Sequence, residues 1–267
     1  MYFITFSRKM GTRGTEIAKL VAKELKYAFY DTEDIEKKAK EMGFFDDIRE
    51  VNDMAPPLLK RVFSCRPEIC LDYLQAVIYE LARLGSAIIL GRGGNMFFRS
   101  LPYALHVRVI ASQEKRIRNL VERGYKREAA LMVMEKSDHE RESFIKFAFH
   151  RDWDNPELYD IVLNMDNLTI NVAADMILCA ARAKEAQGHS GDVTISLDMM
   201  ELAVRVGAAL AESGFPSSYV SAFVNAPGKV RLTGVVQVPW DKSAAERTVL
   251  EVEGVESVEN KIEIACR

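Results

Sequence analysis

Apolar positions in the longer, N-terminal part of the chain form short continuous runs that alternate with helical patterns. Helices are expected where apolar residues recur at three- and four-residue spacing, as they do after residue 14 and from Pro67 to Gly85. Runs without polar alternation are typical of strands buried on both faces, so the sequence predicts an α/β fold with a parallel sheet flanked by helices. The expected strands are residues 2–6, 27–31, 87–90, 105–111 and 159–165.

A polar, glycine-bearing stretch at residues 183–192 interrupts this pattern. Its composition is typical of a linker, and it divides the chain into predicted domains of residues 1–182 and 193–267. Each part is long enough to form a domain with its own core.

The pattern after the linker is different. Residues 197–214 predict a helix, and two alternating runs around the turn at residues 225–228 predict a hairpin. A capping-box pattern beginning at Ser243 predicts a second helix, and a last strand follows within residues 254–265. The order helix, strand, strand, helix, strand describes a small α+β layer (αββαβ).

Most of the strands expected in the first domain end in polar or glycine-rich sequence. The segments concerned are SRKMG, DTED, GRGGN and ASQEKR. In open parallel sheets, ligands bind beyond the carboxyl ends of the strands. The sequence therefore predicts one ligand site at this edge of the sheet.

Composition narrows the class of protein. Hydrophobic residues make up 48% and charged residues 28%, and the formal net charge of −3 gives no reason to expect nucleic acid as a partner. The four cysteines form no CxxC pair, so a structural zinc site is not expected. No apolar stretch approaches the roughly 20 residues that span a bilayer, and no signal-peptide core is apparent, so we expect a cytoplasmic protein.

These residues resemble a known family. SRKMGTRGTEIAKLVAKEL, FYDTEDI, ILGRGGN and SDHERESFIKFAFHRDWDNPELYDIVLNMDNL make the first domain similar to the cytidylate kinase-like family of P-loop nucleoside monophosphate kinases. The resemblance implies a P-loop kinase-like fold, with five strands, and phosphoryl transfer from ATP, carried with Mg²⁺, to a CMP-like acceptor. Residues 193–265 look like a BON domain, through KVRLTGVV and GVESVENKIEI.

The expected phosphate loop departs from its template. Such a loop points backbone N–H groups at a phosphate from the start of a helix, and a lysine reaches the outer phosphates. Here the Gly-Lys-Ser/Thr ending reads Gly14-Thr15-Glu16, and Arg13 stands where relatives tend to have glycine. Arg8, Lys9 or Arg13 could supply the missing cation, whereas a strand–turn–helix connection without a ligand is the alternative. The candidate loop residues are Arg8, Lys9, Met10, Gly11, Thr12, Arg13, Gly14, Thr15 and Glu16.

Two residues are candidates for binding the acceptor. Arg92 follows a buried strand, where a guanidinium can hold a phosphate through two hydrogen bonds. The family's monophosphate kinases often carry an aspartate after this arginine, but here the residue is Gly93. Asp31 ends the second strand and either contacts the acceptor or caps the following helix.

Basic residues within 112–128 suggest a lid that delivers cations to the transferring phosphoryl group. Arg116 and Arg123 are seven residues apart and are expected on one helical face, with Arg118 pointing elsewhere. Asp138 and Arg141 form either a lid pair or an intrahelical salt bridge. Arg116, Arg123 and Arg141 are the catalytic candidates, and no residue is assigned to a metal.

The aromatic residues Phe144, Phe147, Phe149 and Trp153 are most simply explained as core or interdomain packing. The departures at Arg13, Thr15, Glu16 and Gly93 also favour a second hypothesis. It is a catalytically degenerate protein that senses nucleotides or acts as a scaffold through its BON-like domain.

The charge of the second domain bears on its partner. Residues 192–267 contain seven basic and eleven acidic side chains, a difference of 7 − 11 = −4. Anionic membranes attract basic clusters, and none is found here. We therefore expect a protein partner, or self-association, instead of a lipid surface.

Overall fold

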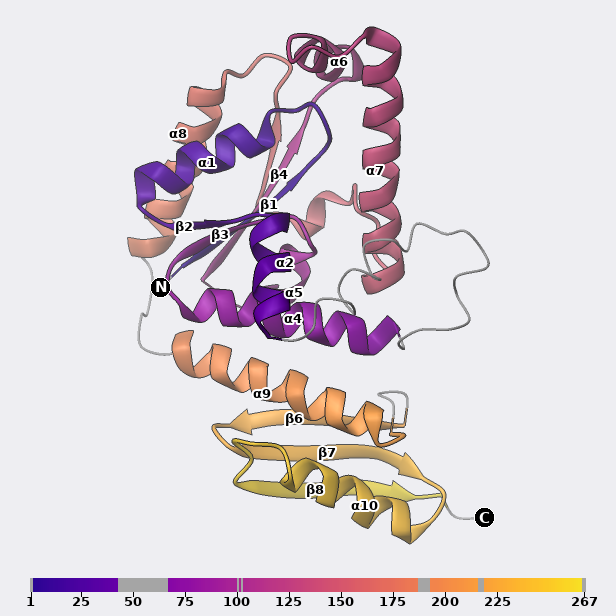
Figure 1. Ribbon diagram of the computed structural model, residues 1–267. Coiled ribbons are helices and arrows are strands. Elements are labelled where there is room, and N and C mark those ends of the chain that lie inside the picture. The colour runs from indigo at the N-terminus through magenta and orange to yellow at the C-terminus, as the bar shows by residue number, and fades with distance from the viewer. Residues whose placement is uncertain are drawn as a thin grey trace. The chain divides into compact units, whose positions relative to one another are not determined.

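The computed structural model describes residues 2–42, 67–99, 101, 103–186, 193–215 and 219–265. The chain forms two compact units (Figure 1), one of residues 1–63 with 84–190 and one of residues 64–83 with 191–267. Among the helices of these described ranges, none has the length and apolar character needed to cross a membrane.

The first unit is built on a sheet of five parallel strands in the order β2-β3-β1-β4-β5, as the sequence predicts. β1 is the central strand and hydrogen-bonds to both β3 and β4, which explains its nearly complete burial. The strands are β1 (Phe3–Arg8), β2 (Ala28–Tyr30), β3 (Ala87–Leu90), β4 (Ala104–Ile110) and β5 (Ile161–Asn164).

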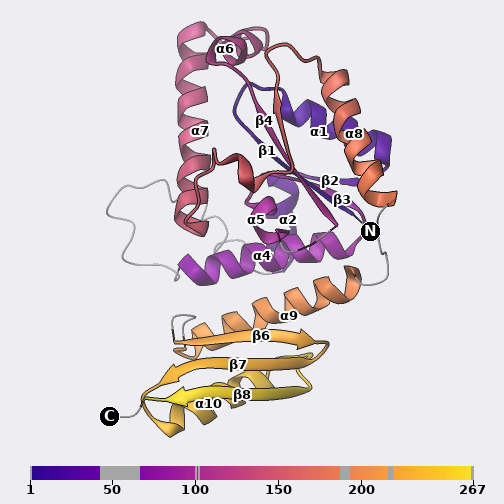
Figure 2. The same ribbon diagram turned by 180° about the vertical axis from the view of Figure 1, so that it is seen from behind.

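Helices cover both faces of this sheet. α1 (Gly14–Leu25) and α8 (Ile170–Ala186) pack together on one face, where Ile17, Val21 and Ile177 are fully buried. α7 (Arg127–Phe149) stands on the opposite side (Figures 1 and 2). The remaining helices are α2 (Thr32–Glu41), α5 (Gly94–Phe97), α6 (Gln113–Val121) and the short 3-10 helix η2 (Pro156–Leu158).

Parallel pairing brings the carboxyl ends of the strands to one edge. Phe6 pairs with Leu90 and Arg8 with Val109, so the segments after β1, β3 and β4 leave the sheet side by side. The polar segments singled out in the sequence therefore lie at the same edge of the sheet.

The second unit contains α4 (Pro67–Arg83), α9 (Val193–Glu212), β6 (Val220–Ala226), β7 (Lys229–Val236), α10 (Pro239–Leu250) and β8 (Ser257–Ile264). β6 and β7 form the predicted antiparallel hairpin, and β8 runs parallel to β7. α4 packs along α9, where the Arg83 guanidinium contacts Asp198 at 3.2 Å and Glu201 at 2.7 Å. The αββαβ order of the expected α+β layer is confirmed.

Two sequence-based boundaries differ in the structure. α10 begins at Pro239, so Ser243 lies inside the helix and the predicted capping box is wrong. Proline suits the first helical position because its fixed φ is helical and no N–H is lost there. α8 continues to Ala186, so residues 183–186 of the expected linker are helical, whereas residues 187–192 lie outside the described part of the chain.

His106 on β4 is a buried titratable group beneath the sheet edge. It is 8% exposed, and its Nδ1 lies 2.8 Å from the Thr5 hydroxyl. Burial lowers the pKa of His106 from 6.5 to about 4, with smaller effects from Lys184 and Arg99, while Asp160 opposes the shift. The neutral imidazole is therefore the form that the fold accommodates.

Stability should fall in acid because of this residue. Between pH 6.5 and about 4, His106 binds a proton in the unfolded chain but stays neutral in the folded protein. The free energy of unfolding therefore decreases as the pH falls through this window. The full effect is about 3 kcal/mol. Urea unfolding from pH 7.5 to 4.5 should show this slope in the natural protein and a shallower one in His106→Gln. Equal slopes would contradict the assignment.

Candidate functional site

The loop from Lys9 to Arg13 joins β1 to α1 in a conformation that depends on Gly11. Gly11 has φ 81°, and a Cβ there would lie 2.8 Å from the Arg116 carbonyl oxygen, so only glycine fits. Arg13 caps α1 with φ 60°, a left-handed conformation that glycine would adopt without strain. Its guanidinium is held by an ion pair with Glu122.

The loop is tied to α6 and α7 by side chains. Met10 donates its backbone N–H to the Asp138 carboxylate at 2.8 Å, and Arg116 forms an ion pair with the same carboxylate. Arg116 also donates to the Met10 carbonyl at 3.2 Å, and Asn119 donates to the Gly11 carbonyl at 2.8 Å. The Asp138 carboxylate thus accepts a hydrogen bond from a backbone N–H group of the loop. In phosphate loops, N–H groups of this kind bind phosphate oxygens.

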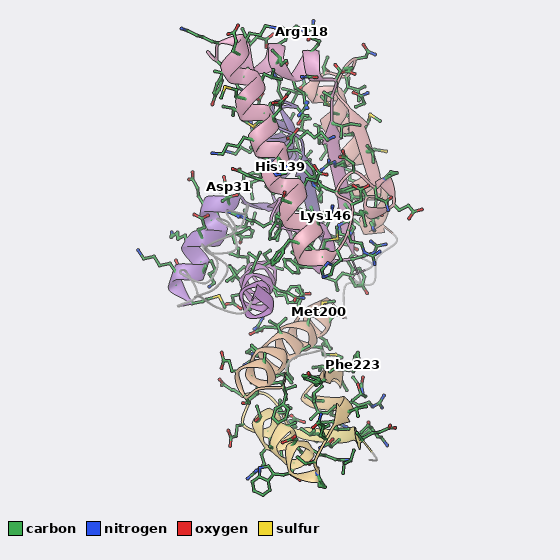
Figure 3. All side chains as sticks on the ribbon, turned by 90° about the vertical axis from the view of Figure 1, so that its right-hand side faces the viewer. Asp31, Arg118, His139, Lys146, Met200 and Phe223 are labelled. Carbon is green, nitrogen blue, oxygen red and sulfur yellow. The ribbon has the colours of Figure 1, made fainter. Side chains whose placement is uncertain are left out.

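Of the three cations expected to replace the missing lysine, Lys9 and Arg13 are paired within the protein. The Lys9 ammonium lies 2.7 Å from Asp154, and Arg123 forms an ion pair with Glu16. α6 ends at Val121, before Arg123, so the expectation that Arg116 and Arg123 share a helical face is wrong. Arg118 is exposed at the surface of α6 (Figure 3), away from the loop as expected.

Beside the loop lies a cavity of about 300 Å³, here called the arginine cavity. Arg8 from the end of β1, Arg92 from the turn after β3 and Arg141 from α7 all line it. The other lining residues are Ser7, Thr32, Gly91, Gly93, Asn95, Ser137, Glu140, Phe144, Ile145, Phe147 and Trp153. Arg8, predicted as part of the phosphate loop, therefore faces the cavity together with Arg92, the predicted acceptor residue.

The three guanidinium groups are only partly neutralised. Arg92 lies 2.9 Å from Glu36, and Arg141 lies 3.8 Å from Asp138. Arg8 has no ion pair among the described residues. Burial first, and then the positive charges of Arg141 and Arg92, lower the pKa of Arg8 to about 9, while Asp31 opposes the shift. All three remain cationic at neutral pH, so the arginine cavity favours an anion.

Aromatic side chains form one wall of the arginine cavity. Phe144, Phe147 and Trp153 line it, a role that sequence reasoning missed by treating them only as packing residues. Phe149 packs edge-to-face on Phe144, with ring centroids 6.0 Å apart. A Cβ at Gly93 would lie 2.6 Å from the Phe149 ring, so a side chain such as aspartate does not fit here unless that ring moves.

Arg108, which the sequence analysis did not single out, packs against Trp153 in this wall. Its side chain is 2% exposed, and its guanidinium carbon lies 3.6 Å from the centre of the Trp153 ring. It donates to the Ser7 hydroxyl at 2.7 Å and forms an ion pair with Asp154. An arginine within the apolar run LHVRVIA was the available signal, because a buried charge requires partners.

Asp31 acts as a helix cap. Its carboxylate accepts the backbone N–H of Glu33 at 3.0 Å, and Asp34 completes a capping box by accepting the Asp31 N–H at 3.0 Å. The capping alternative left open by the sequence is therefore what the structure shows. The adjacent Thr32, and not Asp31, lines the arginine cavity.

The donor set near the loop does not fit a Mg²⁺ ion held by the protein alone. Across the described residues, no group of three or more His, Cys, Asp or Glu side chains could hold a metal. The carboxylates next to the loop, Glu16 and Asp138, are each paired with an arginine. Mg²⁺ usually needs one or two free carboxylates in addition to substrate phosphates.

The five-stranded parallel sheet and its flanking helices form a kinase-like α/β fold. The chain belongs to the cytidylate kinase-like family, whose model matches residues 3–167. A BON domain model matches residues 200–266. Among the curated proteins, none matches the chain significantly.

Solved structures are similar to part of this chain. An uncharacterized protein from Eubacterium ventriosum is 21% identical, with a TM-score of 0.55 and coverage of 68% of this chain and 98% of its own. Shikimate kinase from Bacteroides thetaiotaomicron is 12% identical, with a TM-score of 0.41 and coverage of 68% and 98%. A gluconokinase from Sinorhizobium meliloti is 12% identical, with a TM-score of 0.41 and coverage of 70% and 98%.

The contact between Asp138 and the loop generates a prediction. Replacing Asp138 by Asn keeps the side-chain shape but removes the negative charge that interacts with the Met10 N–H group and with Arg116. The affinity for inorganic tripolyphosphate, measured by calorimetry, should rise about tenfold because the ligand no longer displaces a carboxylate.

Glu135→Gln is the matched control, because Glu135 is exposed on the same helix. It should leave the affinity nearly unchanged. Equal effects of the two variants would mean that only the general loss of negative charge matters. Weaker binding by Asp138→Asn would contradict the idea that Asp138 competes with phosphate for the loop.

Proposed function

We propose that the first unit transfers the γ-phosphoryl group of ATP to a nucleoside monophosphate. The observation that carries this proposal is the convergence of Arg8, Arg92 and Arg141 on one cavity beside the phosphate loop. Phosphoryl transfer needs positioned cations around the donor and acceptor oxygens and little covalent chemistry by the protein. Two adjacent anion sites at the carboxyl edge of a parallel sheet satisfy that need.

In this proposal, residues 9–16 hold the donor phosphates and the arginine cavity holds the acceptor phosphate. Arg116 and Arg141 lie on either side of Asp138, so both reach the boundary between the two sites. They are the best candidates to neutralise the transferring group. Arg123 joins them only if nucleotide binding releases it from Glu16.

Mg²⁺ enters this proposal with the nucleotide. It neutralises the donor phosphates when bound to them, and the chain's own contribution is to orient the two substrates and exclude water. For the acceptor, a CMP-like nucleotide remains our proposal. Gly93 offers no carboxylate to read its base, so selection must rest on the phosphate and the aromatic wall.

A specific observation favours the second candidate function, a nucleotide sensor or scaffold. The loop amide of Met10 and the loop cations Lys9 and Arg13 are engaged by Asp138, Asp154 and Glu122. A loop in this state binds a donor only by breaking those contacts. In this alternative, the first unit turns over substrate slowly or not at all. It acts through the BON-like domain, which we propose spans residues 193–267.

A transfer assay distinguishes the two candidates. Arg92→Met should lower kcat/KM for the acceptor at least 100-fold, because it removes a buried guanidinium from the arginine cavity. The KM for ATP should change little. Labelled ATP with CMP, UMP, AMP or GMP as acceptor provides the measurement.

Arg118→Met serves as the control, because it loses the same charge at an exposed position of α6. It should retain the activity of the natural protein. ATP binding without transfer to any of the four monophosphates would overturn the kinase proposal and favour the sensor.

For the BON-like domain we propose a protein partner or a second copy of the chain. Phe223, Arg231 and Glu259 are cross-strand neighbours on the exposed face of its sheet, where Arg231 and Glu259 pair at 2.6 Å. Phe223 is 53% exposed on this face (Figure 3). An apolar surface whose charges are already paired offers little attraction to anionic lipid.

Cosedimentation of the full chain with vesicles of anionic phospholipid tests this point. We expect less than a tenth of the protein to pellet at physiological salt, because the surface lacks the basic clusters that bind such membranes. Vesicles of neutral lipid provide the baseline. Strong binding that weakens as salt is raised would show a basic patch and contradict a protein-facing role.

A further inference from the structure

Asn95 lies in the wall of the arginine cavity, in the short helix α5 that follows Gly93. Its side chain is buried, with 7% of the residue exposed. The Nδ2 amide has no hydrogen-bond partner among the residues that the structure describes. The proposed mechanism gives this side chain no role.

Buried amides in folded proteins are almost always hydrogen-bonded, because losing hydration without a new partner is unfavourable. An unpartnered donor in the wall of a cavity is therefore explained if a ligand supplies the acceptor. The Nε of Arg92 is likewise buried without a partner. Two donors from one turn thus remain unused beside the same cavity.

The chemistry around Asn95 restricts what the ligand is. Arg8, Arg92 and Arg141 give the cavity a positive potential, and their N–H groups can only donate. A ligand that meets these groups and Asn95 together must be rich in acceptor oxygens and negatively charged. A tetrahedral phosphate dianion offers oxygens in several directions, whereas a planar carboxylate offers two in one plane.

The backbone holds Asn95 in this place. Gly91 packs under the Arg8 guanidinium, since a Cβ there would lie 2.7 Å from an Arg8 nitrogen. Gly94 packs on Ile89, with its added Cβ 3.1 Å from the Ile89 side chain. The turn that carries Arg92 and Asn95 is thereby fixed against β1 and β3, so the two donors keep a constant relation to Arg8.

We propose that Asn95 is a ligand-binding residue whose Nδ2 donates a hydrogen bond to a phosphate oxygen of the bound acceptor. This assignment rests on the proposed function, because that proposal identifies the arginine cavity as the acceptor site. It does not require that phosphoryl transfer takes place. The ligand class is a phosphate monoester, held by its phosphate through three guanidinium groups and one amide.

Titration calorimetry of the full chain without ATP tests the proposal, with inorganic phosphate and CMP as the probes. Asn95→Ala should weaken the binding of both ligands about tenfold, because each loses one hydrogen bond to an anion. Asn95→Asp has the same shape and should weaken binding more, since its carboxylate repels the ligand. Asn167→Leu, at an exposed turn of the same unit, should change neither affinity.

Thermal unfolding separates a binding role from a structural one. Asn95→Asp should raise the Tm of the unliganded protein, because the new carboxylate supplies the counter-charge that the guanidinium groups lack. Asn95→Ala should leave the Tm nearly unchanged, since the amide has no partner to lose. A lowered Tm with unchanged phosphate affinity would make Asn95 structural and overturn the proposal.

Three further outcomes are decisive. Weaker binding of CMP with unchanged binding of phosphate would move the contact away from the phosphate oxygen and overturn the assignment. Failure of the natural protein to bind phosphate or CMP would overturn it as well. If Asn95 variants lose phosphate affinity while the natural protein transfers no phosphoryl group, this inference stands and the proposed function fails.

Discussion

The gathering of three partly buried guanidinium groups is the constraint on which the site depends. Arg8, Arg92 and Arg141 come from β1, the turn after β3 and α7, and they meet at one cavity. The protein supplies part of the compensation through Glu36 and Asp138. The pKa of Arg8 is lowered chiefly by burial and further by the charges of Arg141 and Arg92. An anionic ligand would supply the counter-charge that these groups lack.

Asp138 links this cavity to the phosphate loop. One of its oxygens accepts the Met10 amide, and the carboxylate lies between Arg116 and Arg141. In the proposed function, a donor phosphate would displace Asp138 from the loop and leave both arginines without that counter-charge. Arg141 would then attract an acceptor anion more strongly, and one carboxylate would couple the two proposed sites.

The sequence predicted the fold well because periodicity and burial decide it locally. Continuous apolar runs such as residues 87–90 gave the parallel sheet, and alternating runs around Gly228 gave the hairpin. The start of α10 was misplaced because Pro239 opens the helix before the capping pattern at Ser243. A proline at the first helical position and a capping pattern both mark the start of a helix, and the sequence alone does not decide which of the two applies.

The site was predictable in its residue types but not in its pairings. Arg92 and Arg141 were identified from their positions after a strand and within a predicted lid. That Arg8 turns toward them, away from the loop, depends on the packing of Gly91 and on long-range sheet register. Arg108 was missed although its place within the apolar run LHVRVIA signals burial. Asn95, which we propose contacts the ligand, is buried without such a signal.

The central claim is that three arginines from distant parts of the chain bind one anion together. Arginine side-chain NMR, with Arg8, Arg92 and Arg141 assigned by single substitution, follows their Nε signals during titration with CMP. The account predicts that all three shift together along one saturation curve, while the signal of exposed Arg118 stays in place. Shifts confined to Arg13 and Arg116 at the phosphate loop, with these three unmoved, would contradict it.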